Sequence, residues 1–376
     1  MAPRRGNREG SISRRKDGLW QGAVTLEDGT RKYLYGGSRD EIRRKVGAAL
    51  HSIDVGTMSE SHGITVADFL DQWLGEVVKP NVRPWTFKGY EVHVRLHLKP
   101  TIGKVKLDKL TPLHVHQLLN GKIAGGLSPR SVRYIRGTLR TALNQAVHWG
   151  LISRNAASLV ASPRVEQYEI QPFTPDEARS FLAAIKGDRL EALYSVALTM
   201  GLRQGEALGL EWQDVDLELG YLRINKQLQR HDGIFQLVPT KTATSRRTLA
   251  LPASIVRSLR DHRLRQADER RAIGPPLNGR DLVFTTERGR PIDGSVVSHH
   301  FHDVLASAGL PQRRFHDLRH SCATLLLVQG VSPRVVMDVL GHSQIALTMN
   351  TYSHVIPELK RDAATRMEEL IGDRER

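Results

Sequence analysis

The pattern of apolar residues from Ile64 to about Leu151 is that of amphipathic helices. Apolar residues recur three or four positions apart, which places them on one face of an α-helix. Residues 62–152 are therefore expected to form a four-helix domain. Four signals divide it: Thr65 caps the first helix, Trp85 to Leu98 form the second, Thr111-Pro112 begins the third, and Ser128-Pro129 begins the fourth.

Prolines set the expected boundaries of the first two helices. Pro80 and Pro84 interrupt the first helix, and the second is expected to end before Lys99-Pro100. The reason is that proline lacks the N–H group a helix needs and its ring clashes with the preceding turn.

The first 57 residues predict a small domain of two or three short strands and one helix. Leu19 to Leu26 and Arg31 to Tyr35 are strand-like, and Asp28-Gly29 between them is typical of a hairpin turn. Ser38 is a candidate N-cap for a helix that has Glu41 at the capping-box position. So small a core is expected to present its sheet to a partner.

Residues 170–376 predict a third, mostly helical domain with one small antiparallel sheet. Helices are expected to begin at Thr174-Pro175 and to include 190–200, 294–308, 315–329 and 332–340. Strand-like stretches fall at 214–216, 221–224, 235–238, 247–251 and 282–284. The predicted fold class is thus a multidomain, mainly α chain with two small sheets.

Charge changes the picture from an ordinary globular chain to one that attracts polyanions. Lys and Arg number 55 against 40 Asp and Glu, for a net charge of +15, so nucleic acid is the expected partner. Two groups are candidates for contacting DNA: Arg14, Arg15, Lys16, Arg31 and Lys32 in the first domain, and Arg130, Arg133, Arg136 and Arg140 on the fourth helix of the second. A solvated basic hairpin and a solvated helix face explain the two groups almost as simply.

Cysteine content and hydropathy bear on the compartment. The single cysteine, Cys322, lies in an apolar helical run and is expected to be a small core residue. No disulfide within the chain and no stretch of about 20 apolar residues favour a reducing, cytoplasmic location without a membrane anchor. The pairs His93/His97 and His114/His116 lack the cysteine or carboxylate companions of a metal site, so no metal is expected.

The richest group of chemically active side chains lies between Arg314 and His354. It contains His316, Arg319, His342 and Tyr352. His316 and Arg319 are three residues apart and share a face if the segment is helical. A tyrosine among cations has a lowered pKa, and its cationic neighbours can hold a phosphate.

These residues, with two upstream segments, resemble the tyrosine recombinase (phage integrase) family. Gly201-Leu-Arg203-Gln-Gly-Glu206, Thr240-Lys241-Thr242, His316-x-x-Arg319-His320, Leu340-Gly-His342 and Asn350-Thr-Tyr352 occur in that family's order and approximate spacing. The four-helix domain is similar to the family's core-site (SAM-like) DNA-binding domain. Residues 1–57 are similar to its AP2-like arm-binding domain, and residues 170–376 to its catalytic domain, which has the DNA breaking-rejoining fold.

The resemblance implies a role for six side chains. Tyr352 is the nucleophile that forms a 3′-phosphotyrosine, an ester that conserves the bond energy so that rejoining needs neither ATP nor a metal cofactor. Arg203 and Arg319 bind the non-bridging phosphate oxygens, and Lys241 protonates the leaving 5′ oxygen. His316 accepts the tyrosine proton or binds the phosphate, and His342 donates a further hydrogen bond.

Each motif alone has a simpler explanation. Arg203 with Glu206 is also what an ordinary surface ion pair looks like, Lys241 a solvated turn lysine, and Tyr352 a core tyrosine. Gly341-His342 also fits a helix end where glycine is usual. Their joint occurrence in order favours one catalytic site.

The sequence therefore predicts a site-specific DNA recombinase, an integrase of a phage or other mobile element. It is expected to act as a homotetramer on core and arm sites of double-stranded DNA, through a Holliday junction. The amphipathic tail after Pro357 could pack on its own domain, but the resemblance implies that it docks into a neighbouring subunit. An excisionase and a host DNA-bending protein are open as further partners. The alternatives are a catalytically inactive DNA-binding regulator, a Xer-type resolvase and a type IB topoisomerase.

Overall fold

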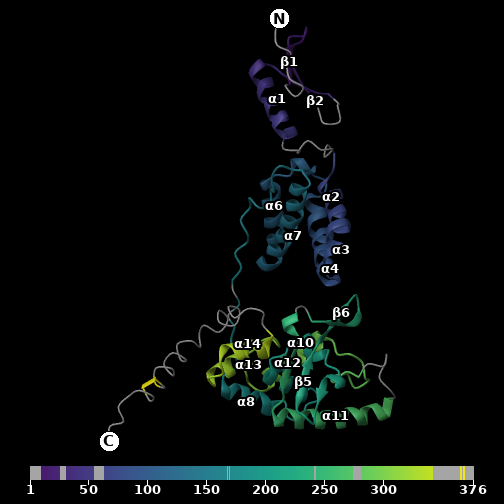
Figure 1. Ribbon diagram of the computed structural model, residues 1–376, viewed down its shortest axis with the longest axis vertical. Coiled ribbons are helices and arrows are strands. Elements are labelled where there is room, and N and C mark those ends of the chain that lie inside the picture. Colours follow the sequence, from purple (N-terminus) through teal and green to yellow (C-terminus); the bar gives the residue numbers. More distant parts are fainter. Residues whose placement is uncertain are drawn as a thin grey trace. The chain divides into compact units, whose positions relative to one another are not determined.

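The computed structural model describes residues 10–25, 31–54, 63–166, 168, 170–240, 243–273, 281–341, 365 and 367–368. Internal contacts divide the chain into two compact units, residues 1–167 and 168–376. Figure 1 shows a mainly helical architecture with small sheets, which confirms the predicted fold class. Within the described part of the chain, none of the helices combines the length and apolar character needed to cross a bilayer.

The N-terminal residues form a three-stranded antiparallel sheet covered on one face by a helix. The strands are β1 (Ser11–Arg14), β2 (Trp20–Thr25) and β3 (Arg31–Gly36), in that order, and the helix is α1 (Arg39–Asp54). A Cβ on Gly22 would lie 2.4 Å from Val46, so α1 packs directly on the backbone of β2. The Ser38 hydroxyl accepts from the Glu41 N–H, as its N-cap pattern predicts. The Asp28-Gly29 turn lies outside the described residues.

Four long helices follow, and they share one apolar core. The first runs through α2 (Val66–Gln72), η1 (Trp73–Val78) and α3 (Lys79–Asn81), and the second through α4 (Pro84–Val92), η2 (His93–Leu98) and α5 (Lys99–Ile102). After the short turn η3 (Leu107–Lys109) come α6 (Pro112–Ala124) and α7 (Pro129–His148).

The expected effect of the prolines on these helices is wrong in one respect. The second helix does not end before Lys99-Pro100 but continues to Ile102, and the first passes through Pro80 to Asn81. Each proline follows a π-helical segment, in which the N–H of the preceding lysine bonds to a carbonyl five residues back (Lys79 to Leu74, Lys99 to Val94). The widened turn gives room for a proline ring that would clash in a regular helix.

The second unit is mostly helical with two small antiparallel sheets rather than the single one expected. The helices are α8 (Pro175–Ala184), α9 (Glu191–Met200), α10 (Gln204–Leu208), α11 (Ala253–Ile273), α12 (Gly294–Ser307), α13 (Asp317–Val328) and α14 (Pro333–Leu340), with short turns η4 (Trp212–Asp214) and η5 (Ala243–Ser245). β4 (Val215–Asp216), β5 (Tyr221–Ile224) and β8 (Arg247–Ala250) form one sheet, and β6 (Lys226–His231) pairs with β7 (Ile234–Pro239) in the other. The 282–284 stretch forms only an isolated bridge, between Leu282 and Glu211.

The β6–β7 hairpin packs against the short helix α10. Its two-residue turn is Asp232-Gly233, both with positive φ (47° and 84°), as a tight hairpin requires. A Cβ on Gly209 would lie 2.5 Å from the Leu228 nitrogen, so the hairpin backbone contacts the end of α10 directly. The hairpin is thereby fixed next to the segment that begins with Arg203.

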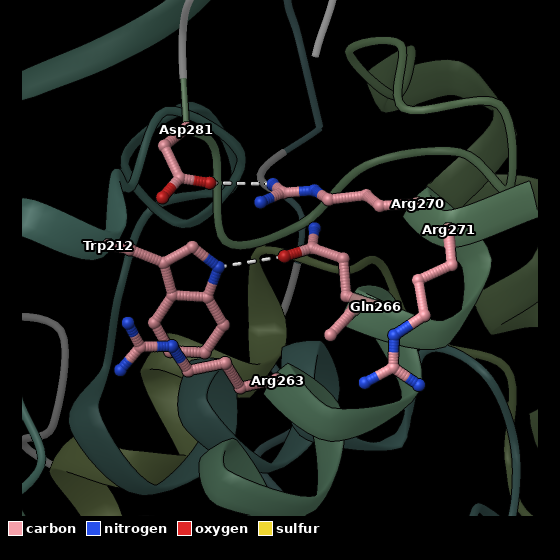
Figure 2. A pocket seen from close by; sticks show the side chains of 7 residues that line it. Trp212, Arg263, Gln266, Arg270, Arg271 and Asp281 are labelled. Atoms are coloured by element: carbon pink, nitrogen blue, oxygen red, sulfur yellow. Dashed lines mark hydrogen bonds and ion pairs between the residues drawn. The ribbon is translucent and has the colours of Figure 1, made fainter. Parts of the chain in front are cut away.

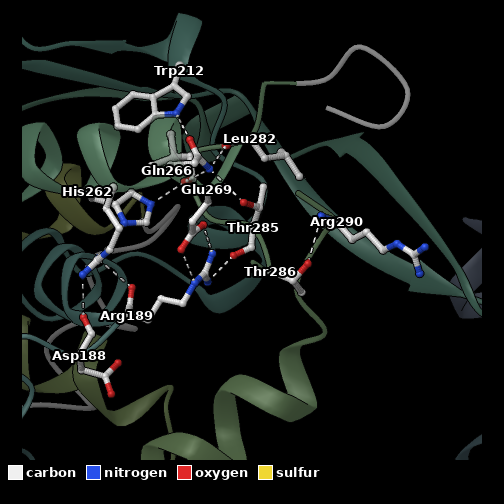
Figure 3. Close-up of polar contacts among 12 residues, drawn as sticks. Asp188, Arg189, Trp212, His262, Gln266, Glu269, Leu282, Thr285, Thr286 and Arg290 are labelled. Carbon is white, nitrogen blue, oxygen red and sulfur yellow. Dashed lines mark hydrogen bonds and ion pairs between the residues drawn. The ribbon is translucent and has the colours of Figure 1, made fainter. Parts of the chain in front are cut away.

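A polar network anchors the long helix α11 to the rest of this unit (Figure 3). The Gln266 amide accepts from the Trp212 indole N–H at 2.7 Å and donates to the Leu282 and Val283 carbonyls and the Thr285 hydroxyl. Arg189 donates twice to Glu269, at 2.9 and 2.7 Å, and once to the Thr285 carbonyl. The network satisfies these buried polar groups and makes α11 a rigid side of the scaffold.

Candidate active site

Arg203 is positioned by a sharp helix end and a helix start. Helix α9 ends at Gly201, whose φ of 62° is left-handed, and α10 begins after Arg203, which occupies the N-cap position. A Cβ on Gly201 would come within 2.5 Å of the Leu340 side chain and 3.2 Å of the Cys322 sulfur. Glycine is thus required at 201 both for its conformation and for the close approach of α13 and α14.

The buried Glu206 carboxylate holds the Arg203 side chain in place. Its carboxylate is 2% exposed; Oε1 accepts from Nη1 of Arg203 at 2.6 Å, and Oε2 accepts from Nη2 of Arg247 at 3.0 Å. Burial raises the pKa of Glu206, but the two arginines, Arg247 foremost, outweigh it and hold this pKa below the usual value. A third of the Arg203 side chain, 35%, remains exposed. Arg203 and Glu206 are therefore more than an ordinary surface pair.

Arg319 lies almost completely buried on the first turn of α13, 2% exposed. Its Nη1 donates to the Gly201 carbonyl at 2.7 Å, and its Nη2 donates to the Leu340 carbonyl at 2.6 Å. These oxygens belong to the C-terminal ends of α9 and α14, where unpaired carbonyls and the helix dipole favour a cation. One guanidinium thus joins three helices.

Arg247 completes a closed path of contacts. Its Nε donates to the Val339 carbonyl at 2.6 Å, one residue before Leu340, and its Nη2 reaches Glu206. We call this path the contact ring; it runs through Gly201, Arg203, Glu206, Arg247, Val339, Leu340 and Arg319 and returns to Gly201. Gly341, with φ of 65°, lets it close, because a Cβ there would lie 3.1 Å from the Arg247 guanidinium and 3.1 Å from the Thr244 carbonyl.

His316 lies directly before α13 and within electrostatic range of both arginines. Its side chain reaches solvent, yet surrounding protein shields the ring enough to lower its pKa to about 4. The positive charges of His320, Arg319 and Arg203 lower this pKa further, and Asp317 opposes them. The His316 imidazole is thus neutral at physiological pH.

Asp317, next to His316, fixes the start of α13. Its buried carboxylate accepts from the backbone and side chain of Arg314 and, at 2.8 Å, from the Tyr168 hydroxyl. Burial raises the Asp317 pKa, but the hydrogen bonds from Arg314 and Tyr168 outweigh it and lower it. The Arg314 guanidinium stacks 3.6 Å above the Tyr168 ring. The segment entering this unit is therefore tied to the helix that carries Arg319.

The structure therefore brings together three of the six predicted catalytic side chains, Arg203, His316 and Arg319. Lys241, His342 and Tyr352 lie outside the described residues, as does most of the tail after Pro357. The residues directly before Lys241 and His342 are described. Thr240, before Lys241, is buried at 6% beside the end of β7, and Gly341, before His342, belongs to the α14 end that Arg247 and Arg319 contact.

Sequence reasoning missed Arg247. A signal for it was present, since Arg247 alternates with Leu249 on β8 and with Leu251 directly after it, and the two leucines are 5% and 9% exposed. An arginine on the apolar face of a strand requires buried acceptors. In this structure they are a carboxylate and two carbonyl groups.

The candidate DNA-contacting residues do not all face solvent. Arg130, Arg133 and Arg140 are exposed on α7, but Arg136 donates through Nε and Nη2 to the Val160 carbonyl, at 2.9 and 2.5 Å. Arg136 thus holds the Val160 backbone of its own unit, which sets it apart from the three exposed arginines of α7.

Two of the candidate DNA-contacting residues on the N-terminal sheet lie on opposite faces. Arg31 lies on the open face with Tyr33 and Tyr35, which are 48% and 45% exposed, whereas Lys32 alternates to the α1 side with Leu34. Arg15 stacks over the Tyr35 ring and pairs with Asp17. Arg14 and Lys16 are exposed.

Three of the four histidines considered as metal ligands have other partners. His93 Nδ1 bonds to the Thr138 hydroxyl at 2.8 Å, His114 closes the capping box of α6, and His116 bonds to Asn120. Within the described part of the chain, no group of three or more His, Cys, Asp or Glu is arranged to hold a metal ion.

A pocket of about 430 Å³ lies beside α11, formed by other residues than those of the contact ring (Figure 2). Its polar side chains already have partners in the structure. Arg270 pairs with Asp281, Gln266 bonds to Trp212, Arg271 pairs with Asp268, and Arg263 stacks over the Trp212 ring at 5.1 Å. None of the candidate-site side chains that the structure describes lines this pocket.

Solved structures show to which class this fold belongs. The chain superimposes on the Tn1549 transposon integrase bound to circular intermediate DNA with a TM-score of 0.69 and 23% identity, over 81% of this chain and 100% of that one. It superimposes on a lambda integrase tetramer bound to a Holliday junction with a TM-score of 0.56 and 20% identity, over 89% and 95% of the two chains. The fold is that of the DNA integrases.

Sequence comparison identifies the family. The Phage integrase family matches residues 171–358, and the phage integrase N-terminal SAM-like domain matches residues 65–123. A XerC-like tyrosine recombinase of Caldanaerobacter subterraneus is 33% identical, covering 91% of this chain and 92% of that protein; an integrase of Saccharopolyspora erythraea is 29% identical, covering 93% and 94%. The chain belongs to the phage integrase family and is a tyrosine recombinase. The predicted family and enzyme class are confirmed.

Proposed function

We propose that this tyrosine recombinase is the integrase of a phage or other mobile element. It cleaves and rejoins double-stranded DNA at core sites and uses the six residues Arg203, Lys241, His316, Arg319, His342 and Tyr352. The observation that supports this proposal best is the contact ring, which holds two arginines beside a neutral histidine. Such a fixed cationic site matches a phosphodiester, which carries one negative charge on its non-bridging oxygens.

The chemistry assigned to the site balances in one step. The Tyr352 oxygen bonds to phosphorus, and the bond from phosphorus to the 5′ oxygen breaks. His316, neutral at physiological pH, accepts the tyrosine proton, and Lys241 gives a proton to the 5′ oxygen. Arg203, with its partly exposed guanidinium, contacts the phosphate, and the Arg319 charge stabilises the five-coordinate transition state. Rejoining is the reverse reaction with a 5′ hydroxyl from the other duplex.

The first unit supplies DNA recognition in this proposal. Residues 62–152 bind the core site with Arg130, Arg133 and Arg140 on the exposed side of α7. Residues 1–57 bind arm sites with the open face of their sheet, where Arg31 lies on the same side of β3 as the exposed Tyr33 and Tyr35. Residues 170–376 then carry the catalysis, in the cytoplasm where bacterial DNA lies.

We further propose that four copies act together. Recombination exchanges strands between two duplexes in two pairs, so four tyrosines must be coordinated, and a tail helix docked into the neighbouring subunit would do this. The lambda integrase, with which this chain shares its fold, forms a tetramer on a Holliday junction. An excisionase and a host DNA-bending protein are the natural accessory partners of such an assembly.

A suicide substrate tests this function. A nicked DNA that carries the core site releases a short 5′ fragment on cleavage, so the covalent adduct accumulates and migrates as a shifted band in denaturing gels. The wild type is expected to form it, and Tyr352→Phe to form none. Tyr221→Phe is the matched control, because Tyr221 is an exposed tyrosine on β5 of the same unit.

The outcomes separate the alternatives. No adduct from the wild type on a verified site would refute the enzymatic proposal and favour a DNA-binding regulator. Adduct with plasmid relaxation but no recombinant product would indicate a topoisomerase. Recombination that proceeds on core sites alone, without loss when residues 1–57 are deleted, would favour a Xer-type resolvase.

A further inference from the structure

We propose that Arg247 is a positioning residue for strand cleavage: it holds Glu206, and through it Arg203, in register with the end of α14. The inference rests on the proposed role of Arg203 and adds a residue that acts without touching DNA. The Arg247 side chain is 6% exposed and lies beneath the site on β8, so it reaches the substrate only through its neighbours.

The contacts of Arg247 need the shape of a guanidinium. Nε donates to the Val339 carbonyl at 2.6 Å, Nη1 to the Ser245 carbonyl at 3.1 Å, and Nη2 to Glu206 Oε2 at 3.0 Å. All three nitrogens are used, each for an acceptor on a different segment. A lysine has one nitrogen at the end of a flexible chain and cannot span these acceptors, so charge alone does not replace Arg247.

Arg247 also keeps the Glu206 carboxylate ionised. Glu206 is 2% exposed, and a carboxylate so buried remains ionised only beside cations. Arg247 contributes most to keeping its pKa low, with Arg203 second. Without Arg247, a single partly exposed arginine would remain to balance the charge. Glu206 would then lose its fixed orientation, and Arg203 its fixed acceptor.

Two active-site segments depend on this arginine. On one side, Glu206 Oε1 sets the position of the Arg203 guanidinium. On the other, the Val339 carbonyl fixes the last turn of α14, two residues before Gly341-His342. Gly341 has no side chain where Arg247 passes, and any Cβ there would press on the guanidinium at 3.1 Å. Arg247 therefore sets the distance between Arg203 and the end of α14.

A purely structural arginine in the same unit provides the control. Arg189 also has three acceptor contacts, two on Glu269 and one on the Thr285 carbonyl, but these partners belong to the α11 network (Figure 3) and not to the contact ring. Arg189→Ala is expected to lower the melting temperature as much as Arg247→Ala does. It should leave the cleavage rate of the folded enzyme unchanged.

The experiment measures three quantities for the full-length chain on a nicked core-site substrate: the Kd for DNA, the rate of adduct formation at saturating DNA, and the melting temperature. Arg247→Ala and Arg247→Lys are expected to bind DNA like the wild type. They should form adduct about 10- to 100-fold more slowly, since sub-ångström misplacement of a catalytic group has effects of this size. Guanidinium ion at low millimolar concentration should partly restore Arg247→Ala and leave Arg247→Lys unchanged.

The rates of the variants decide whether Arg247 positions Arg203. A wild-type rate for Arg247→Lys, or an equal rate loss for Arg189→Ala, would overturn the positioning role. If Arg247→Ala does not fold, Arg247→Lys carries the test, because it keeps a cation beside Glu206. Arg203→Ala separates the two proposals: if it cleaves at the wild-type rate, the proposed function of Arg203 fails; if it is inactive while both Arg247 variants are fully active, only the present inference fails.

Discussion

Replacing Gly201 by alanine tests whether the helix ends around Arg319 are packed as closely as described. The φ of 62° costs an L-residue about 1–2 kcal/mol. The new methyl carbon would lie 2.5 Å from the Leu340 side chain and 3.2 Å from the Cys322 sulfur, and overpacking of this kind costs about 1–3 kcal/mol more. We expect Gly201→Ala to lower the free energy of unfolding of this unit by about 2–5 kcal/mol.

Gly309→Ala separates the two contributions. Gly309 follows α12 with a nearly identical φ of 65°, but a Cβ there meets nothing within 4 Å. This variant should lose only the conformational part, about 1–2 kcal/mol. The two variants should therefore differ in their free energy of unfolding by about 1–3 kcal/mol, which is the contribution of the close packing around Gly201.

The only cysteine of the chain provides the assay. Cys322 is buried in the second unit, and burial raises its thiol pKa to about 12, so a thiol reagent reacts with it only after this unit opens. The labelling rate under native conditions reports the free energy of that opening. Gly201→Ala should react about 5- to 150-fold faster than Gly309→Ala. Equal rates for the two variants would refute the close approach of α9, α13 and α14.

Two further predictions concern His316 and the arginines of α7. In NMR spectra of the DNA-free protein, the His316 signal, assigned with His316→Gln, should titrate near pH 4. Because this folded pKa lies below the ordinary 6.5, the stability that neutral His316 contributes is complete above about pH 6.5 and is lost as the pH falls towards 4. A titration midpoint near 6.5 would contradict the site described. Arg133→Ala should weaken DNA binding and reduce the slope of log Kd against log salt concentration by about 1, without loss of stability. Arg136→Ala removes two hydrogen bonds to Val160, so it should lower the stability of its unit by about 1–2 kcal/mol and leave the slope unchanged. Identical behaviour of the two variants in both the salt titration and thermal melts would show that Arg133 and Arg136 do not differ in role.

Helix starts were predictable from the sequence because their signals are local. Thr65, Thr111, Ser128 and Thr174 were placed from the sequence at helix starts, and each accepts a hydrogen bond from the N–H three residues later. A contact over three residues depends on little beyond the segment itself. The same is true of Gly341, which fitted a helix end in the sequence and has a left-handed conformation at the end of α14.

Local rules failed where a neighbouring irregularity changes their outcome. Pro80 and Pro100 should end helices, and they do not, because a π-helical segment precedes each. Strand β6 was missed for a different reason: among Lys226–His231 only Leu228 is apolar, so no alternation marks it. Its position depends on packing against α10 and pairing with β7, which the segment does not encode by itself.

For the candidate site, the sequence identified residues but not how they are held. Order and spacing of motifs indicated Arg203, His316 and Arg319. Nothing in them indicated Arg247, whose partners Glu206 and Val339 lie 41 and 92 positions away. Such contacts form only when the whole unit folds, so the alternation with Leu249 and Leu251 shows that Arg247 needs buried acceptors but not which residues supply them.

The closed form of the contact ring affects how it fails. A chain of contacts falls apart when one link is cut, but a ring with one link cut is still connected the other way round. Loss of the Arg247 link alone leaves Arg203 and the end of α14 joined through Gly201 and Arg319, and loss of the Arg319 link alone leaves them joined through Glu206 and Arg247. Only the second cut separates the two segments. The two segments therefore stay connected after any one of these cuts, although Arg247 still sets how precisely they are placed, and the cost of a second mutation depends on whether the first has already occurred.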